Sequence, residues 1–187
     1  MIKVTSSFYK VSLLACFSFL FSFVASAQDK TPLSPPANAT GKIGAATVNI
    51  DYSSPGVKGR TIGKEIAPYG QVWRTGANAA TKITFSKDVT LEGKPVKAGT
   101  YSLFTVPNQN EWVIILNKTA EQWGAFKYEE AQDLLRVTVK PNTSKENNER
   151  FKIAISEKGK NAGVMTLLWG NISVPVNIKV APTTASM

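Results

Sequence analysis

The stretch "TYSLFTVPNQNEWVIILN", residues 100–117, decides the fold class. It contains two runs rich in β-branched and aromatic residues, 100–107 and 111–117, with the polar turn "NQN" between them. Such runs, bounded by turn residues, are typical of β-strands, and the short connection indicates an antiparallel hairpin. The second run is apolar at nearly every position, which is typical of a strand buried on both faces. This stretch therefore predicts a strand hairpin inside a sheet.

Apolar and polar residues alternate in the same way on both sides of this hairpin. The pattern recurs in "ATVNIDYS" (46–53), "TKITFS" (81–86), "DVTLEGKPVKAG" (88–99), "LLRVTVKP" (134–141) and "RFKIAIS" (150–156). A period of two residues is the signature of half-buried strands. The segment "GVMTLLWGNISVPVNIKV" (163–180) predicts a further hairpin that turns at Gly170 and Asn171, with Pro175 placing its second arm at a sheet edge.

Helical signals are confined to residues 119–135, where Gly124 interrupts the pattern. We therefore expect one or two short helical turns and no longer helix. Many short strands without a sustained helical period predict an all-β fold. The expected architecture is a single domain over residues 43–180, either a two-sheet antiparallel sandwich or a jelly-roll-like barrel.

The first 27 residues are typical of a signal peptide. Lys3 and Lys10 precede the apolar run 11–25, and the small residues Ala25 and Ala27 precede Gln28. This pattern predicts cleavage after Ala27, export to the periplasm or the cell exterior, and no transmembrane segment afterwards. The sequence "LLAC" ending at residue 16 also resembles a lipobox, but most of the apolar run follows it, so a lipid anchor is the less consistent alternative.

The segments that flank the expected domain are poor in residues that pack into a core. Residues 28–42 are rich in Pro, Ser, Thr and Ala, and we expect a flexible linker there. The tail "APTTASM" (181–187) has a similar composition and is expected to be disordered.

The composition excludes several chemistries. The chain has no histidine, and Cys16, within the expected signal peptide, is its one cysteine. A Ser-His-Asp triad, a cysteine nucleophile and the usual zinc or copper ligand sets are therefore absent from the mature sequence. No acidic run resembles a calcium loop, so we expect neither a bound metal nor a cofactor. The formal net charge of +9 suits either solubility or an anionic partner, and export makes nucleic acid an unexpected one.

The long connection between the strands at 46–53 and 81–86 contains the first candidate site residues. Connections of this length without secondary structure are usually functional or disordered, and the aromatic residues here argue against disorder. The guanidinium groups of Arg60 and Arg74 suit a carboxylate, phosphate or sulfate. Tyr69 and Trp73 offer flat faces for a sugar ring, and Asn78 offers an amide.

A second candidate region lies at residues 121–137. Trp123 would form the opposite wall of a cleft if this region folds toward Trp73. Asp133 would then be paired with Asp51, giving two carboxylates for glycoside chemistry if their separation is suitable.

The same residues are also consistent with a purely structural role. Trp73 would then plug the core, Arg74 would pair with Asp51 or Glu65, and Asn78 would satisfy its own turn. Three functions therefore remain open: a binding domain for a glycan or an anionic envelope component, a histidine-free carbohydrate-active hydrolase or lyase, and a structural or partner-binding domain. The sequence leaves open whether the chain is an enzyme and which oligomeric state it has.

Several blocks of the sequence resemble a known family. They include "PYGQVWRTGANAATKITFSKDV", "AGTYSLFTVP", "EWVIILNK" and "DLLRVTVKP". These blocks are similar to a family of exported bacterial proteins known as domain of unknown function 2911, over about residues 43–180. The resemblance implies secretion and a single, all-β domain, and it implies no activity, ligand or site residue.

Overall fold

The computed structural model describes residues 32–180. The predicted signal peptide (1–27) and the predicted disordered tail (181–187) lie outside the described residues. Within 32–180, no helix is long and apolar enough to cross a membrane.

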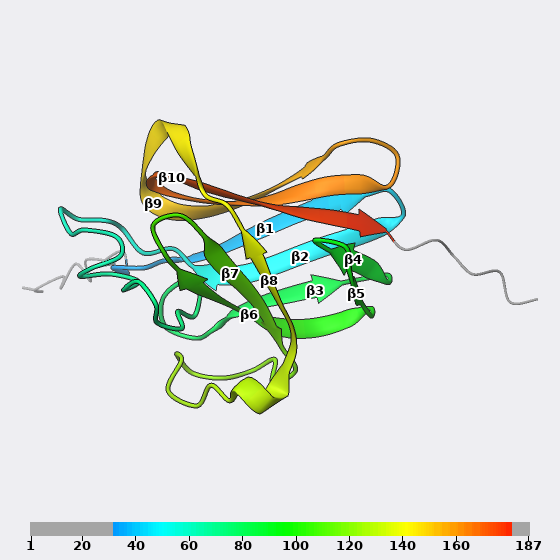
Figure 1. Ribbon diagram of the computed structural model, residues 1–187, viewed down its shortest axis with the longest axis horizontal. Helices are drawn as coiled ribbons and strands as arrows, with labels where there is room; N and C mark the ends of the chain where they lie inside the picture. The colour runs from blue at the N-terminus through cyan, green and yellow to red at the C-terminus, as the bar shows by residue number, and fades with distance from the viewer. Residues whose placement is uncertain (1–31, 181–187) are drawn as a thin grey trace, which may run out of the picture. The chain divides into compact units, whose positions relative to one another are not determined.

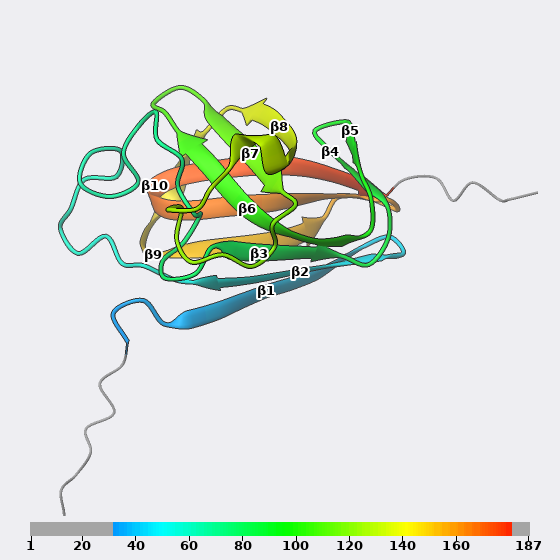
Figure 2. The same ribbon diagram turned by 90° about the horizontal axis from the view of Figure 1, so that it is seen from below.

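The strands form two antiparallel sheets, which are shown from two directions in Figures 1 and 2. The first sheet has the order β1 (Pro36–Ile43), β2 (Ala46–Ser53), β3 (Thr81–Phe85), β6 (Gly99–Pro107), β7 (Trp112–Asn117) and β8 (Asp133–Val139). The second has the order β5 (Lys94–Val96), β4 (Val89–Leu91), β10 (Ala162–Val180) and β9 (Asn142–Glu157). The prediction of an all-β sandwich is confirmed, and the sheets do not close into a barrel.

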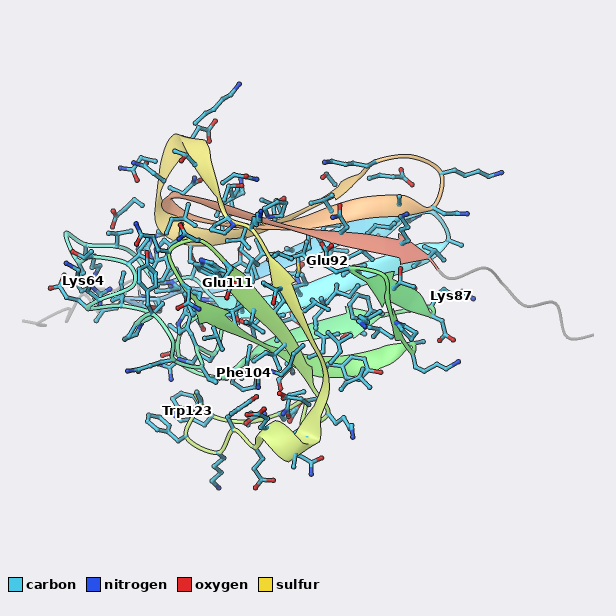
Figure 3. The ribbon with its side chains drawn as sticks, in the orientation of Figure 1. Lys64, Lys87, Glu92, Phe104, Glu111 and Trp123 are labelled. Carbon is cyan, nitrogen blue, oxygen red and sulfur yellow. The ribbon has the colours of Figure 1, made fainter. Side chains whose placement is uncertain are left out.

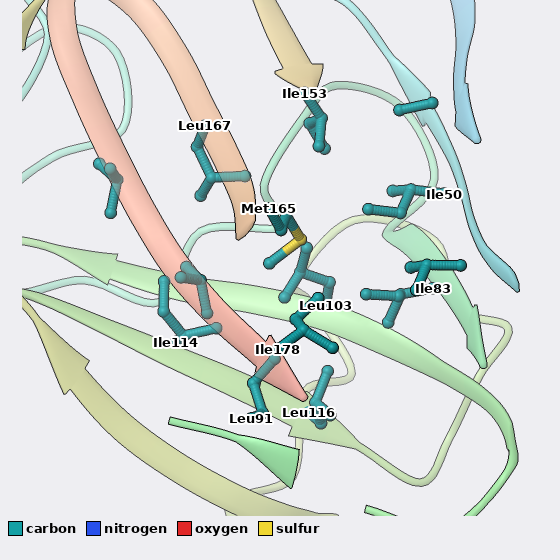
Figure 4. Packing of buried hydrophobic residues seen from close by; sticks show 14 of the residues in the cluster. Ile50, Ile83, Leu91, Leu103, Ile114, Leu116, Ile153, Met165, Leu167 and Ile178 are labelled. Atoms are coloured by element: carbon teal, nitrogen blue, oxygen red, sulfur yellow. The ribbon is translucent and has the colours of Figure 1, made fainter. Parts of the chain in front are cut away.

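The main core lies between the two sheets, as Figure 4 shows. Alternate side chains of each strand enter it, as the sequence period of two requires. The first sheet contributes, among others, Ile50, Ile83, Leu103, Ile114 and Leu116, and the second contributes Leu91, Ile153, Met165, Leu167 and Ile178. The core accounts for the apolar positions that alternate along the sequence.

Strand β7 is buried on both faces, as its composition predicts. Its outer face is covered because Ile115, with Phe104 and Ala80, forms a second apolar cluster on the far side of the first sheet. Ala125 and Tyr128, from the connection between β7 and β8, pack against this cluster. That connection contains one short helical turn, η1 (Glu130–Gln132), in agreement with the expected one or two.

Residues 36–42 of the expected linker (28–42) form a strand instead, and residues 28–31 lie outside the described residues. Strand β1 begins at Pro36 and pairs with β2 along its whole length, from Pro36 opposite Ser53 to Ile43 opposite Ala46. Ala39 and Ile43 are buried, although the segment has few large apolar residues. Backbone pairing with β2 holds this strand, and backbone pairing leaves little trace in composition.

The expectation of a hairpin turn at Gly170 and Asn171 is wrong. Strand β10 is continuous from Ala162 to Val180, and the turn that joins it to β9 lies at residues 158–161. Gly170 has a φ of 53°, which the chain uses for a β-bulge instead of a turn. Pro175 is not on an edge strand either: it lies between the part of β10 that pairs with β9 and the part that pairs with β4, so its missing N–H costs no ladder hydrogen bond.

Candidate functional site

The connection between β2 and β3, residues 54–80, is held against both sheets by its backbone. Near its start, Val57 N donates to Glu149 O at 2.8 Å, and Phe151 N donates to Pro55 O at 2.8 Å. Near its end, Trp73 exchanges two backbone hydrogen bonds with Thr105, at 2.7 and 2.9 Å. The connection is therefore an ordered part of the domain.

Backbone strain is concentrated in this connection. Among residues 32–180, four of the five non-glycine residues with positive φ lie in it: Lys58, Ala67, Thr75 and Asn78. Such conformations cost about 1–3 kcal/mol each and gather at functional sites, where surrounding contacts impose them. The strain supports a functional role for this part of the chain.

Trp73 belongs to a cluster of aromatic rings at this end of the core. Its ring stacks on Trp169 with centroids 5.1 Å apart and 11° between the planes. It also meets Phe151 and Trp112 edge to face, with centroids 5.1 and 6.3 Å apart. Trp73 is only partly buried, so it packs on the core and also reaches the surface.

Beside this aromatic cluster lies a concavity of about 360 Å³. Its wall includes Trp73 and Trp169, together with Arg60, Arg74 and Glu65. The concavity joins an apolar surface to two guanidinium-bearing residues and one carboxylate. A site with these groups suits a ligand that has both an apolar face and a negative charge.

Arg74 is the least satisfied of these residues. Its buried Nε has no hydrogen-bond partner, and Arg74 forms no salt bridge with any residue in 32–180. The two carboxylates expected to pair with it are bound elsewhere: Asp51 accepts from Asn38 at 2.7 Å, and Glu65 accepts from the backbone N–H of Thr61 at 2.7 Å. The structural role expected for Arg74, an ion pair with either acid, is therefore absent.

Gly124, in the connection between β7 and β8, leaves space for the Arg74 guanidinium. A Cβ on Gly124 would lie 2.7 Å from Nη1 of Arg74, and Gly124 has a φ of +67°. The guanidinium therefore rests on the backbone between β7 and β8. This packing fixes the direction of the side chain without neutralising its charge.

Arg60 has a more constrained position. Its Nε donates to Val57 O at 3.1 Å, and its Nη2 donates to Gly56 O at 2.7 Å. These two bonds stabilise the start of the connection between β2 and β3, and Nη1 takes part in neither bond. Arg60 therefore combines a structural role with one free edge of its guanidinium.

The other three expected ligand-binding residues do not line this concavity. Tyr69 is 40% exposed and lines a different concavity. Asn78 has a φ of 60° and donates to Ser53 Oγ at 3.2 Å, so it ties the end of the connection to β2 instead of satisfying its own turn. Trp123 is 66% exposed on the connection between β7 and β8, where Figure 3 shows it at the molecular surface. It lines a third concavity with Lys82 and Gln122.

Trp169 is the wall residue that the sequence did not single out. It lies in β10, more than 90 residues from Trp73 along the chain, and its buried Nε1 has no hydrogen-bond partner in the described part of the chain. In the sequence it is one of many apolar residues in a strand. No local signal separates it from ordinary core residues.

The structure contradicts the proposed carboxylate pair. The register of the first sheet aligns Asp51 with Lys82, then Ser102, Asn117 and Asp133 on successive strands. Four strand spacings of about 4.8 Å place the two acids roughly 19 Å apart. Glycoside hydrolysis requires a separation of about 5–9.5 Å. Asp51 and Asp133 therefore do not form a catalytic pair.

Asp133 has a structural role at the start of β8. Its side chain is 7% exposed and accepts hydrogen bonds from Asn117 Nδ2 at 2.9 Å, Tyr128 Oη at 2.6 Å and Arg136 Nη1 at 3.2 Å. Burial, and then the hydrogen bond to this carboxylate, raise the pKa of the Tyr128 phenol well above its ordinary value. The network fastens the connection between β7 and β8 to the sheet.

The raised pKa of Tyr128 makes its contribution to stability sensitive to high pH. Because the folded state favours the neutral phenol, the contribution is complete below the unfolded-state pKa of about 10 and is lost as pH rises through the folded-state value. The difference in unfolding free energy between wild type and Tyr128→Phe, measured by urea denaturation, should therefore change as the pH rises above 10. A difference that stays constant from pH 8 to the highest accessible pH would contradict this assignment.

No group of three or more Asp, Glu, Cys or His side chains in the described part of the chain is arranged to hold a metal ion.

Fold and site together define a β-sandwich domain with an aromatic and arginine-lined concavity under a long, strained connection. The chain belongs to the family described as "Protein of unknown function (DUF2911)", whose model matches residues 34–178. No curated protein and no solved structure matched the chain.

Proposed function

We propose that this protein is an exported binding domain that takes an anionic glycan, or another anionic component of the cell envelope, in the concavity lined by Trp73 and Arg74. The observation that carries the proposal is the state of Arg74. Its charge has no carboxylate partner in residues 32–180, and its buried Nε has no hydrogen-bond acceptor. Arg74 as a residue is only partly buried, and an anionic ligand would supply the charge partner that the described residues lack.

The other wall residues suit the rest of such a ligand. Trp73 and Trp169 form an apolar wall against which the C–H face of a sugar ring packs. Arg60 adds a second positive charge, and Glu65 offers an acceptor for hydroxyl groups. The volume of about 360 Å³ lies at the lower end of the roughly 300–1,000 Å³ typical of small-molecule sites, which suits one or two sugar residues.

Export is part of the proposal because it decides which ligands the domain meets. The basic residues, apolar run and small residues at positions 1–27 support cleavage after Ala27. A chain released in this way encounters the charged polysaccharides and lipids of the envelope. This location favours an acidic glycan over a cytoplasmic metabolite.

The proposal is tested by titrating trigalacturonate, and its uncharged methyl ester, into wild type and three variants. Wild type should bind the acid and not the ester. Arg74→Ala should weaken binding about 10–100-fold, because hydrogen bonds to charged groups contribute about 1.5–3 kcal/mol. Arg74→Lys should recover only part of the loss, since an ammonium lacks the planar donor pair.

The matched control is Lys87→Ala, which removes one positive charge from an exposed position. Lys87 lies at the other end of the sandwich from Lys64, which is the sequence neighbour of the wall residue Glu65 (Figure 3). It should bind like wild type. Calorimetry gives the affinities, and circular dichroism verifies folding. Equal losses in Arg74→Ala and Lys87→Ala would show a non-specific charge effect and overturn the site. Equal binding of the acid and its ester would overturn the anionic ligand.

A further inference from the structure

A second concavity, of about 160 Å³, lies at the same end of the sandwich and shares no wall residue with the first. Three separate parts of the chain meet there around Tyr69. They are the turn between β6 and β7, the start of β9, and the bulged part of β10. Trp112, which is 2% exposed, contributes to the wall and also contacts Trp73, so the aromatic cluster lies between the two concavities.

The wall of this concavity is polar and carries no charge. It includes four side-chain amides from the three converging segments: Asn108, Gln109, Asn142 and Asn171. None of the four makes a side-chain hydrogen bond within residues 32–180, whereas the strand amides of Asn38, Asn117 and Asn177 are bonded to neighbouring side chains. Each free amide offers two donors and one acceptor oxygen. The concavity therefore gathers unused donors and acceptors from all three segments.

Tyr69 provides a fixed aromatic surface beside these amides. A Cβ on Gly63 would lie 2.3 Å from two atoms of the Tyr69 ring, so the ring lies flat against a residue that must be glycine. Gly63 also has a φ of +88°, and Tyr69 N donates to Gly63 O at 3.0 Å. One face of the ring is thus covered by the backbone, and 40% of the residue remains exposed. A ring held in this way loses little conformational entropy when a ligand stacks on it.

We propose that this concavity is a binding site for a single uncharged sugar residue of an oligosaccharide. Paired amides match the vicinal hydroxyl groups of a sugar, which both donate and accept hydrogen bonds, and the ring of Tyr69 matches its C–H face. An anionic group finds no cation in this wall. The volume is below the roughly 300–1,000 Å³ of sites for larger ligands, which limits the site to one residue. The site is independent of the anionic site at Arg74.

The test is a titration of ¹⁵N-labelled protein with four neutral trisaccharides: maltotriose, cellotriose, mannotriose and chitotriose. The side-chain amide resonances of Asn108, Gln109, Asn142 and Asn171 report directly on the wall. At least one probe should shift them saturably at millimolar concentration, in the range of weak single-residue recognition. Absence of a saturable shift with all four probes at about 10 mM would overturn the proposal.

Variants separate this site from general surface effects. Tyr69→Ala should abolish the shifts, and Tyr69→Phe, which keeps the ring, should retain them. Asn142→Ala combined with Asn171→Ala should weaken binding at least tenfold, whereas Asn147→Ala, an exposed asparagine of β9 outside the wall, should not. Shifts that persist unchanged in Tyr69→Ala would overturn the proposal.

Arg74→Ala should leave these shifts intact, because Arg74 is not part of this wall. If neutral sugars bind here and trigalacturonate does not bind at Arg74, the anionic function fails and the neutral site stands. If trigalacturonate binds at Arg74 and no neutral sugar binds here, the proposal of the neutral site fails and the anionic function stands. Loss of neutral binding in Arg74→Ala would contradict two independent sites.

Discussion

Replacing Phe151 with alanine is expected to lower the free energy of unfolding by about 3–5 kcal/mol, the range measured for large aromatic residues in protein cores. Phe151 is 1% exposed and packs edge to face on three rings, those of Tyr52, Trp73 and Trp169. Its backbone N–H also bonds to Pro55 O, at the base of the long connection. The cavity left by this substitution would therefore loosen both the core and the floor of the proposed site.

Phe126→Ala is the matched control, because it makes the same chemical change at a phenylalanine that is 85% exposed. Its effect should stay within about 0.5 kcal/mol. Urea denaturation followed by tryptophan fluorescence measures both values. If Phe151→Ala cost less than about 1 kcal/mol, or if the two substitutions cost the same, the packing described at this end of the core would be contradicted.

The second large effect is expected for Asp133→Ala, with a loss of about 2–3 kcal/mol in unfolding free energy. The carboxylate is 7% exposed and accepts from Asn117, Tyr128 and Arg136. Without it, the partly buried hydroxyl of Tyr128 loses its acceptor, and the connection between β7 and β8 loses its attachment to the sheet. Faster hydrogen exchange in residues 118–132 should accompany the loss.

Glu121→Ala tests whether this effect depends on burial. Glu121 lies in the same connection and pairs with Lys82 at 3.3 Å, but its side chain is 82% exposed. Exposed ion pairs contribute little to stability, so this substitution should leave the unfolding transition almost unchanged. If Glu121→Ala destabilised the protein as much as Asp133→Ala, the claim that the buried Asp133 network contributes more to stability than the exposed Lys82–Glu121 pair would be wrong.

The fold class follows from the sequence because alternation along a strand is a local property. Val48 and Ile50 point into the core, and residues two apart on β3, Ile83 and Phe85, do the same. Strand β1 was missed because its stability comes from pairing with β2, which its own composition does not reveal. Gly170 was misassigned because positive φ serves turns and bulges alike, and the choice depends on the partner strand.

The wall of the candidate site was predictable to the extent that its residues are close in sequence. Arg60, Trp73 and Arg74 belong to one connection, and they do line one concavity. Trp169 comes from β10, and Gly124, which accommodates Arg74, comes from the connection between β7 and β8. Such long-range neighbours depend on sheet order, which the pattern of single strands does not specify. Sheet order also separates Asp51 from Asp133 by four strand spacings.

The absence of histidine, and of cysteine after residue 16, limits what this domain can do chemically. The sheet register also removes Asp51 and Asp133 as a catalytic pair. Two concavities of different character then lie at one end of the sandwich, one with arginines and one with neutral amides. Together, the two proposals predict a ligand class that combines acidic and neutral sugar residues.

The central claim is that Arg74 receives the negative charge of a ligand. The resonance of the Arg74 Nε–H group, in protein labelled with ¹⁵N at arginine, tests this claim most directly because that nitrogen is buried without an acceptor. Titration with trigalacturonate should move this resonance strongly and saturably, and the methyl ester should not. An Arg74 Nε–H resonance that stays in place while trigalacturonate binds, or the absence of any binding by wild type, would contradict the account.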